Sequence, residues 1–462
     1  MTDIYAVLSM GGQALLTHQR AIYVTGNNIA NVNTPGYSRQ RLRLESNTPA
    51  QTAMGLMGNG VRAAGVERIY ERFLGIQINQ ESQNLGRWEA FKDGAEAVEV
   101  VFDETDGYGL SQALSEFWNA WHDVSNNPSG QTERIVLRAK AESLTDTFNG
   151  KYADLLREQQ QLDMRIQDAV DQINRLSEEI ADLNQKIVET ESGGHPANDY
   201  RDRRDLLLKE LSGYIDINTI EDAGGSVSVS VASGRSLVER TQTWQLDTQT
   251  NADGLAQIVW LDGAGGAVDM TDQITGGKLK GWLDVRDGVI QDYLYRLDNL
   301  AQTLTDEVNA LHAAGFGLDG STGNAFFSGA GAAGIEVNAA ILDNVNLIAA
   351  ASTAEGVPGD NRNAIAIAAL QHELLIDGNT ATLDAYYQSL VSDSGTQVQR
   401  ADAHHSHQLD MVSHLENYRD SISGVSLDEE MVNLVKFQSA YEAAAKLIST
   451  ADELMQTVLQ ML

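Results

Sequence analysis

Both ends of the chain carry the same apolar spacing, and this feature constrains the fold more than any other. Apolar and small residues recur at alternating intervals of four and three from Ile4 to Val32, and again from Leu434 to Leu462. Such a period places a narrow apolar stripe along a helix, and the stripe needs a partner helix to cover it. The residues that we expect to form the two stripes, or seams, are Ile4, Leu8, Leu15, Ile22 and Ile29 at one end and Leu434, Phe437, Tyr441, Ile448, Met455, Val458 and Leu462 at the other.

The charges near the two ends favour pairing of these helices with each other. Residues 1–43 contain four arginines and one acid, whereas residues 421–462 contain six acids and two lysines. Opposite charge on two seamed helices predicts that the termini meet and that the middle of the chain is looped out between them. Arg39, Arg41 and Arg43 follow the first helix, and they could pair with acids of a neighbouring subunit or lie on a solvated strand edge. This organisation indicates assembly rather than chemistry.

Most of the intervening chain is predicted to be helical. Apolar residues from Leu162 to Ile187 keep heptad spacing within one long helix that we expect from about 130 to 191. The last helix should begin at Ser426, in a capping box whose Glu429 carboxylate reaches back to the helix start. Further helices are expected at about 69–101, 109–124, 199–212, 278–313, 382–422 and 427–462.

Two stretches break the helical pattern. Short alternating runs between glycines over about 214–277 predict a small antiparallel β unit. Residues 314–377, rich in Gly, Ala and Asn, are expected to form a second insertion, which could pack on the first. The predicted fold class is therefore mainly α with a β insertion. Its expected parts are a coiled-coil-like end domain (1–50 and 424–462), a helical rod (51–213, 278–313 and 378–423), the β insertion (214–277) and the second insertion (314–377).

Composition narrows the function. A net charge of −33 argues against nucleic acid or an anionic membrane as the main partner. No run of about 18 apolar residues occurs, so we expect no membrane insertion. The first residues lack a charged segment followed by a continuous apolar core, so we expect no cleaved signal peptide. The absence of cysteine fits either a cytosolic protein without a redox role or a protein that leaves the cell unfolded.

A histidine cluster is the best candidate for a chemical site. It runs from His404 through His405 and His407 to His414, and on a helix His407, Asp410 and His414 would share a face that could hold a metal ion. The cluster lacks a His-Glu-x-x-His pattern and a second ligand group, so we interpret it as the polar face of a long helix. A metalloenzyme that uses this cluster is the distant alternative. We expect no enzyme activity, no metal and no cofactor.

Residues 27–37 carry the most specific signal in the chain. They read Asn-Asn-Ile-Ala-Asn-Val-Asn-Thr-Pro-Gly-Tyr, with Pro and Gly where a type II turn prefers them after a helix. Asn31, Asn33, Pro35, Gly36 and Tyr37 in this order resemble the N-terminal signature shared by the bacterial flagellar axial proteins, the family of rod, hook and hook-associated subunits.

Other segments are more similar to the hook-associated members than to rod or hook subunits. The continuation Ser38-Arg39-Gln40 is one, and the others are residues 127–137, 197–207 and 424–441. The resemblance implies a structural subunit that joins hook to filament, with a rod or hook subunit of the same family as the alternative. It implies an extracellular place in the flagellum, reached through the flagellar type III export apparatus without a cleaved signal. The partners implied are other copies in a ring-like homo-oligomer, the hook protein, a second hook-associated junction protein and a cytosolic export chaperone at the C-terminal helix.

Overall fold

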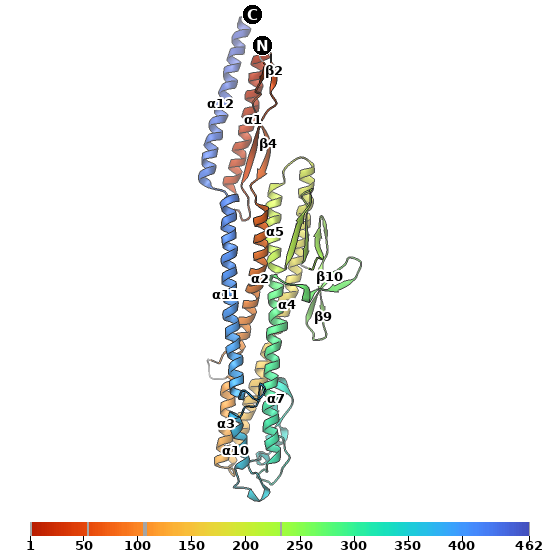
Figure 1. The fold of residues 1–462 in the computed structure, drawn as a ribbon, viewed down its shortest axis with the longest axis vertical. Coiled ribbons are helices and arrows are strands. Elements are labelled where there is room, and N and C mark those ends of the chain that lie inside the picture. The colour runs from red at the N-terminus through yellow and green to blue at the C-terminus, as the bar shows by residue number, and fades with distance from the viewer. Residues whose placement is uncertain (1, 53–54, 105–108, 232, 462) are drawn as a thin grey trace.

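The molecule is long and narrow, with both termini at one end (Figure 1). The structure, a computed structural model, describes residues 2–52, 55–104, 109–231 and 233–461. Most of its elements are helices, and small antiparallel sheets occupy the middle of the chain. The predicted fold class, mainly α with a β insertion, is therefore confirmed. Within the described residues, no helix is long and apolar enough to cross a membrane.

The two terminal helices lie side by side and antiparallel at that end (Figure 1). The imidazole of His18 stacks on the ring of Phe437 with the centroids 6.4 Å apart. Further along, Gly11 faces Ile448, and a Cβ atom at Gly11 would lie only 2.8 Å from Ile448 Cγ1, so the missing side chain permits close approach. The helices are α1 (Thr2–Ala30) and α12 (Leu427–Gln460).

A β-hairpin packs along α1 and completes the end domain, which we define as α1, α12 and residues 40–68. Its long strands are antiparallel, with a bulge between Arg43 and Leu44. The sequence offered a strand only as one alternative for Arg39, Arg41 and Arg43, and it did not predict the hairpin, in which the expected domain limit at residue 50 falls. Leu42 and Leu44 alternate with Arg41 and Arg43 on β1, but this alternation offers only two apolar residues, and Leu44 remains 41% exposed. The strands are β1 (Gln40–Ser46), β2 (Ala50–Thr52), β3 (Gly55–Met57) and β4 (Val61–Arg68).

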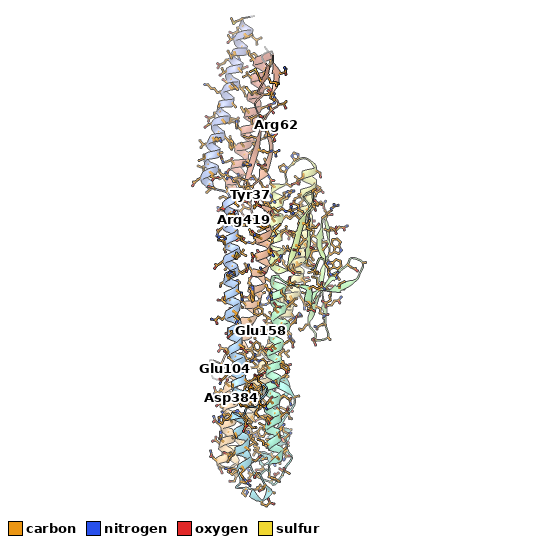
Figure 2. All side chains as sticks on the ribbon, viewed as in Figure 1. Tyr37, Arg62, Glu104, Glu158, Asp384 and Arg419 are labelled. Carbon is orange, nitrogen blue, oxygen red and sulfur yellow. The ribbon has the colours of Figure 1, made fainter. Side chains whose placement is uncertain are left out.

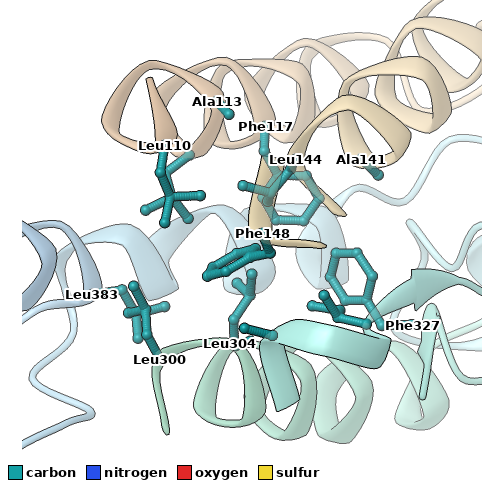
Figure 3. Packing of buried hydrophobic residues seen from close by; sticks show 14 of the residues in the cluster. Leu110, Ala113, Phe117, Ala141, Leu144, Phe148, Leu300, Leu304, Phe327 and Leu383 are labelled. Carbon is teal, nitrogen blue, oxygen red and sulfur yellow. The ribbon is translucent and has the colours of Figure 1, made fainter. Parts of the chain in front are cut away.

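Long helices form the rod below the end domain, close to the ranges expected. The expected helix at 278–313 contains a π-helical segment, η2 (Asp284–Val289), which the sequence did not predict. Figure 3 shows part of the rod core, where Phe117, Phe148 and Phe327 pack together with leucines from neighbouring helices. The rod helices are α2 (Arg72–Val101), α3 (Leu110–Asn126), α4 (Gln131–Ser192), α5 (Asn198–Tyr214), α6 (Gly277–Leu283), α7 (Ile290–Ala314) and α11 (Leu383–Ser423).

The predicted antiparallel β unit projects from the side of the rod (Figure 1). It has one sheet in the order β5-β6-β7-β8 and another in the order β11-β10-β9, and it shares a buried apolar cluster with α4, α5 and α6. Its strands are β5 (Ile217–Glu221), β6 (Val227–Val231), β7 (Ser236–Glu239), β8 (Gln242–Thr243), β9 (Leu246–Thr250), β10 (Ala256–Leu261) and β11 (Ala267–Asp269), followed by η1 (Thr271–Gln273).

Residues 315–382 cap the far end of the rod. The suggestion that this insertion packs on the β unit is wrong, because Phe326, Phe327 and Ile335 join the apolar core of α3, α4 and α7 instead. His312 of α7 helps to hold it: its Nδ1 lies 2.7 Å from the Asn324 carbonyl, and its Nε2 accepts the Ala349 amide at 3.0 Å. The elements are β12 (Phe327–Ser328), α8 (Gly331–Gly334), β13 (Glu336–Val337), α9 (Ala339–Asp343), η3 (Val345–Leu347), η4 (Ala354–Gly356), α10 (Arg362–Ala369) and η5 (Leu370–His372).

Candidate functional site at the paired ends

The structure brings the two expected seams together. The described seam residues of both helices are half-buried, and none of them is exposed. Contacts such as Gly11 with Ile448 show that they meet across the helix pair. Leu462, the last expected seam residue, lies outside the described residues. Small residues contribute as well, since Ala444 and Ala451 of α12 are buried between the larger seam positions.

The turn after α1 has the geometry that its sequence favours. Gly36 has φ +76°, which L side chains rarely adopt, and the Tyr37 amide donates to the Thr34 carbonyl at 3.2 Å. Asn31 donates from Nδ2 to the Asn27 carbonyl at 3.0 Å, while its Oδ1 accepts from the Thr34 hydroxyl at 3.0 Å. Pro35, between these residues, and Asn33 are exposed. Side chains of the turn itself therefore form hydrogen bonds at the C-terminal end of α1.

Asn28 is the centre of this turn, although the sequence analysis did not single it out. Its Oδ1 accepts from the Tyr37 hydroxyl at 2.9 Å and from the Gln40 amide at 3.0 Å. Its Nδ2 donates to the Gln40 carbonyl at 2.8 Å and to Glu430 Oε2 of α12 at 3.0 Å. Burial, followed by the nearby carboxylates of Asp199 and Asp202, raises the pKa of Tyr37, so its hydroxyl stays a donor. The only sequence signal for Asn28 is its place in the turn motif.

The arginines after the turn have ion-pair partners within the chain, an arrangement that was not among the two alternatives left open by the sequence. Arg39 contacts Glu429 and Glu430 at the start of α12, both at 2.7 Å. Its hairpin neighbours also have internal partners: Arg41 pairs with Glu67 at 2.7 Å, and Arg43 lies 3.5 Å from Glu45.

Helix α12 begins as expected, with one difference. The Ser426 hydroxyl accepts from the Glu429 amide at 3.5 Å, which is the first half of a capping box. The Glu429 carboxylate, expected to reach back to the helix start, accepts from Arg39 instead. A charged partner on the hairpin therefore takes the place of the second capping bond, and it ties the start of α12 to β1.

The end domain joins the rod through polar contacts at one level of the molecule. Tyr37 and Arg419 lie close to this level in Figure 2. The Arg39 amide donates to the Ser423 carbonyl at 2.8 Å, where α11 gives way to α12. The Ser38 amide donates to Asp202 of α5 at 2.9 Å. Burial raises the pKa of Asp202 although Ser38 and Arg68 act in the opposite direction.

Large hydrophobic side chains remain exposed on the paired helices. Within the described residues, neither of the two large apolar core clusters includes a residue of the end domain. Tyr23 is 77% exposed and Met461 82%. Exposed apolar surface of this extent on two packed helices is typical of an interaction site. The exposed large hydrophobic residues are Tyr5, Leu16 and Tyr23 on α1, then Leu427, Met431, Val432, Val435, Leu447, Leu454 and Leu459 on α12, and Met461 directly after it.

A groove of about 420 Å³ lies between the hairpin and α12. Its apolar lining includes Val24, Leu42 and Phe437. Arg41 and Lys436 line it as well, and in the described part of the chain Lys436 has no ion-pair partner. The groove therefore combines apolar surface with a cation that is available to an acidic partner.

The histidine cluster does not form a metal site. His404 stacks on Trp88 of α2 with the ring centroids 4.2 Å apart and the planes at 13°. His407 and His414 are exposed on α11. Across the described ranges, no group of three His, Cys, Asp or Glu side chains is placed to hold a metal ion. The cluster is part of the α2–α11 packing and of the solvated face beside it.

Comparison with known proteins agrees with this architecture. The family model described as the flagellar hook-associated protein FlgK helical domain matches residues 95–327. The flagellar hook-associated protein 1 of Bacillus subtilis is 30% identical over 99% of this chain and 98% of its own length. The chain belongs to the flagellar hook-associated protein 1 family.

A further relative, and family models that match the two ends of the chain, agree with this family assignment. The flagellar hook-associated protein 1 of Salmonella typhimurium is 27% identical over 96% of this chain and 97% of its own. Models described as flagella basal body rod protein and flagellar basal body rod FlgEFG protein C-terminal match residues 8–37 and 419–461. The ends are thus common to flagellar axial proteins, and the middle of the chain marks the hook-associated protein 1 family.

A solved structure shares the fold. The flagellar hook junction protein FlgK from Burkholderia pseudomallei superimposes with a TM-score of 0.68 at 16% identity, covering 75% of this chain and all of that one. This chain is accordingly a flagellar axial structural protein of the hook–filament junction class.

Proposed function

We propose that the protein assembles with copies of itself into a ring-like layer between hook and filament, with its end domain as the polymerisation surface. The hook protein and a second hook-associated junction protein are the proposed neighbours along the axis. The role is mechanical and involves no catalytic group or cofactor. The observation that carries this proposal is the set of exposed hydrophobic residues on α1 and α12, in a domain whose described residues belong to neither of the two large apolar core clusters.

Burial of those residues by a neighbour would supply the driving force. Each large apolar side chain that leaves water contributes about 1.5–3 kcal/mol, so a few such contacts per interface are enough for a stable assembly. The groove beside Phe437 offers a place for a neighbouring α12, because that helix exposes acids such as Glu442 and Glu453 that can approach Lys436.

Export without a cleaved signal, through the flagellar type III apparatus, is the proposed route to the flagellum. A chain without cysteine can be unfolded and refolded without the risk of wrong disulfides, which suits such a route. Before export, the exposed apolar residues of α12 would need cover, and we propose that a cytosolic chaperone binds there.

The test uses a strain from which the gene has been deleted. The double variant Val435→Asp, Leu454→Asp changes two exposed residues of α12, so it should leave the fold intact and abolish the interface. We expect this variant to reach the medium but not to restore swimming, while filament subunit is lost from the cells. Met164→Asp, at an exposed apolar position of α4 on the rod, is the matched control and should swim normally. Normal swimming with the double variant would exclude this surface from assembly.

A further inference from the structure

The first two turns of α5 carry acids and arginines on different faces of the helix. Asp199, Asp202 and Asp205 are spaced by three, as are Arg201 and Arg204. Residues three apart on a helix are neighbours, so each set forms its own short row. The row of acids and the row of arginines contact different parts of the molecule.

The acidic row holds the end domain. Arg68, at the end of β4, donates from one nitrogen to Asp202 at 2.9 Å and to Asp205 at 2.7 Å. Asp202 also accepts from the Ser38 amide in the turn after α1. Asp199 accepts from the Gln40 side chain at 2.6 Å. Every carboxylate of this row therefore binds a group of the turn or the hairpin.

The arginine row holds the β unit and the end of α4. Arg201 pairs with Glu191 of α4 at 2.6 Å and with Glu221 of β5. Arg204 donates to the Gly225 carbonyl in the β5–β6 turn at 2.6 Å. It also donates to Asn184 Oδ1 at 3.0 Å, and Asn184 in turn exchanges hydrogen bonds with both backbone groups of Val227.

The central groups of the two rows, together with Arg68, are deeply buried. Asp202 is 6% exposed and Arg204 1%, and the side chain of Arg68 is 11% exposed. Removing one partner from such a pair leaves an uncompensated charge in a region of low dielectric constant, which is strongly unfavourable. The buried groups of both rows must therefore keep their partners at once, which constrains the placement of α5 between the two parts.

We infer that residues 198–205 act as a two-sided coupler, which fixes the direction of the end domain relative to the rod and ties that direction to the β unit. Asp202 and Arg68 position the end domain, and Arg204 positions the β unit. A force on the paired ends would thereby reach the outward-facing β unit through one helix. This inference concerns the single chain, so it stands or falls independently of the proposed assembly.

The test uses the cysteine-free chain, in which two introduced cysteines are the sole labelling sites. Spin labels at Ser449→Cys on α12 and Asp168→Cys on α4, both exposed positions, report the distance between end domain and rod. In Arg68→Gln we expect the distance distribution to become about twofold broader or more. The matched control is Arg41→Gln, which removes a hairpin arginine whose partner, Glu67, lies on the hairpin itself. It should leave the distribution unchanged.

Hydrogen exchange tests the coupling to the β unit. Arg68→Gln should also raise the exchange rate of amides in residues 217–231, although within the described residues Arg68 forms no ion pair with that segment. Arg204→Gln should broaden the label distance. An unchanged distance distribution in Arg68→Gln would overturn the positioning role. A broadened distribution with unchanged exchange in 217–231 would overturn the coupling. If Arg68→Gln fails to fold by circular dichroism, Asp205→Asn replaces one of the two ion pairs of Arg68 by a neutral partner and should give an intermediate width.

Discussion

Asn28 and Glu430 stand 402 positions apart in the chain and are joined by a buried hydrogen bond of 3.0 Å. The bond connects the end of α1 to the start of α12, next to the turn that leads into the hairpin. Arg39 contacts the same carboxylate from the other side at 2.7 Å. One buried glutamate thus holds together the three segments that form the end domain.

Replacing Asn28 by Asp should open this contact. The variant Asn28→Asp places a second carboxylate beside Glu430, and two buried like charges cost the end domain about 2–4 kcal/mol. Hydrogen exchange in α1 and α12 at pH 7 should therefore be faster than in the wild type. When the pH is lowered, protonation of the introduced carboxyl group removes the repulsion, and protection should return. Asn33→Asp, at an exposed position of the same turn, should show neither effect.

The paired ends should be less stable than the rod in the free chain. Their helices contribute no residue to the two apolar core clusters of the described structure, whereas α4 contributes to both. Exchange of α12 amides in dilute monomer should consequently be faster than exchange in α4 near Phe148 and Ile166. Equal, strong protection of both regions would show that the end domain needs no neighbour to become ordered.

A charge in the seam should separate folding from assembly. Ile448 is half-buried opposite Gly11, so Ile448→Asp should cost the end pair about 2 kcal/mol and prevent its ordered association. Thermal unfolding of the rod should stay unchanged because the core clusters are distant in the fold. The neighbouring Ser449→Asp, at an exposed position, is the control. Restoration of swimming in a deletion strain by Ile448→Asp would contradict this role of the seam.

These results show which features the sequence could predict. The seams and the rod helices follow from local periodicity, so residues such as Leu434 and Ile166 can be placed from their spacing alone. The hairpin was not predicted, although Leu42 and Leu44 alternate with Arg41 and Arg43 on β1, because this short alternation does not identify the partner strand and the pairing with β4 is long-range. The partner of Arg39 could not be predicted either. The opposite charges of the two ends predicted that the ends attract each other, but not that Glu429 and Glu430 of α12 in the same chain bind this arginine.

Acid should weaken the far end of the rod through His312. Burial lowers the pKa of His312 to about 4, and its Nε2 must stay unprotonated to accept the Ala349 amide. In the unfolded chain the same group has a pKa near 6.5, so below that pH the unfolded state binds more protons than the folded state. The stability of this region should therefore fall as the pH drops from about 6.5 to about 4, by about 3 kcal/mol in total, and level off below. The free energy of unfolding, measured against pH for the wild type and for His312→Gln, isolates this contribution. The variant should lack the decrease that His312 causes between about pH 6.5 and about pH 4.

Close backbone contact between α2 and α5 should make Gly86 sensitive to the smallest substitution. A Cβ atom there would lie 2.1 Å from the Gly213 carbonyl oxygen, and backbone on both sides leaves no flexible side chain to move away. Gly86→Ala should therefore lower the free energy of unfolding by about 1–3 kcal/mol. Gly150→Ala, in α4 with no atom near its Cβ, should instead raise it by about 0.5–1 kcal/mol through helix propensity. Denaturant unfolding of both variants measures whether each substitution lowers or raises the free energy of unfolding. Because the coupler lies on the first turns of α5, Gly86→Ala should also weaken the connection between the rod and the end domain.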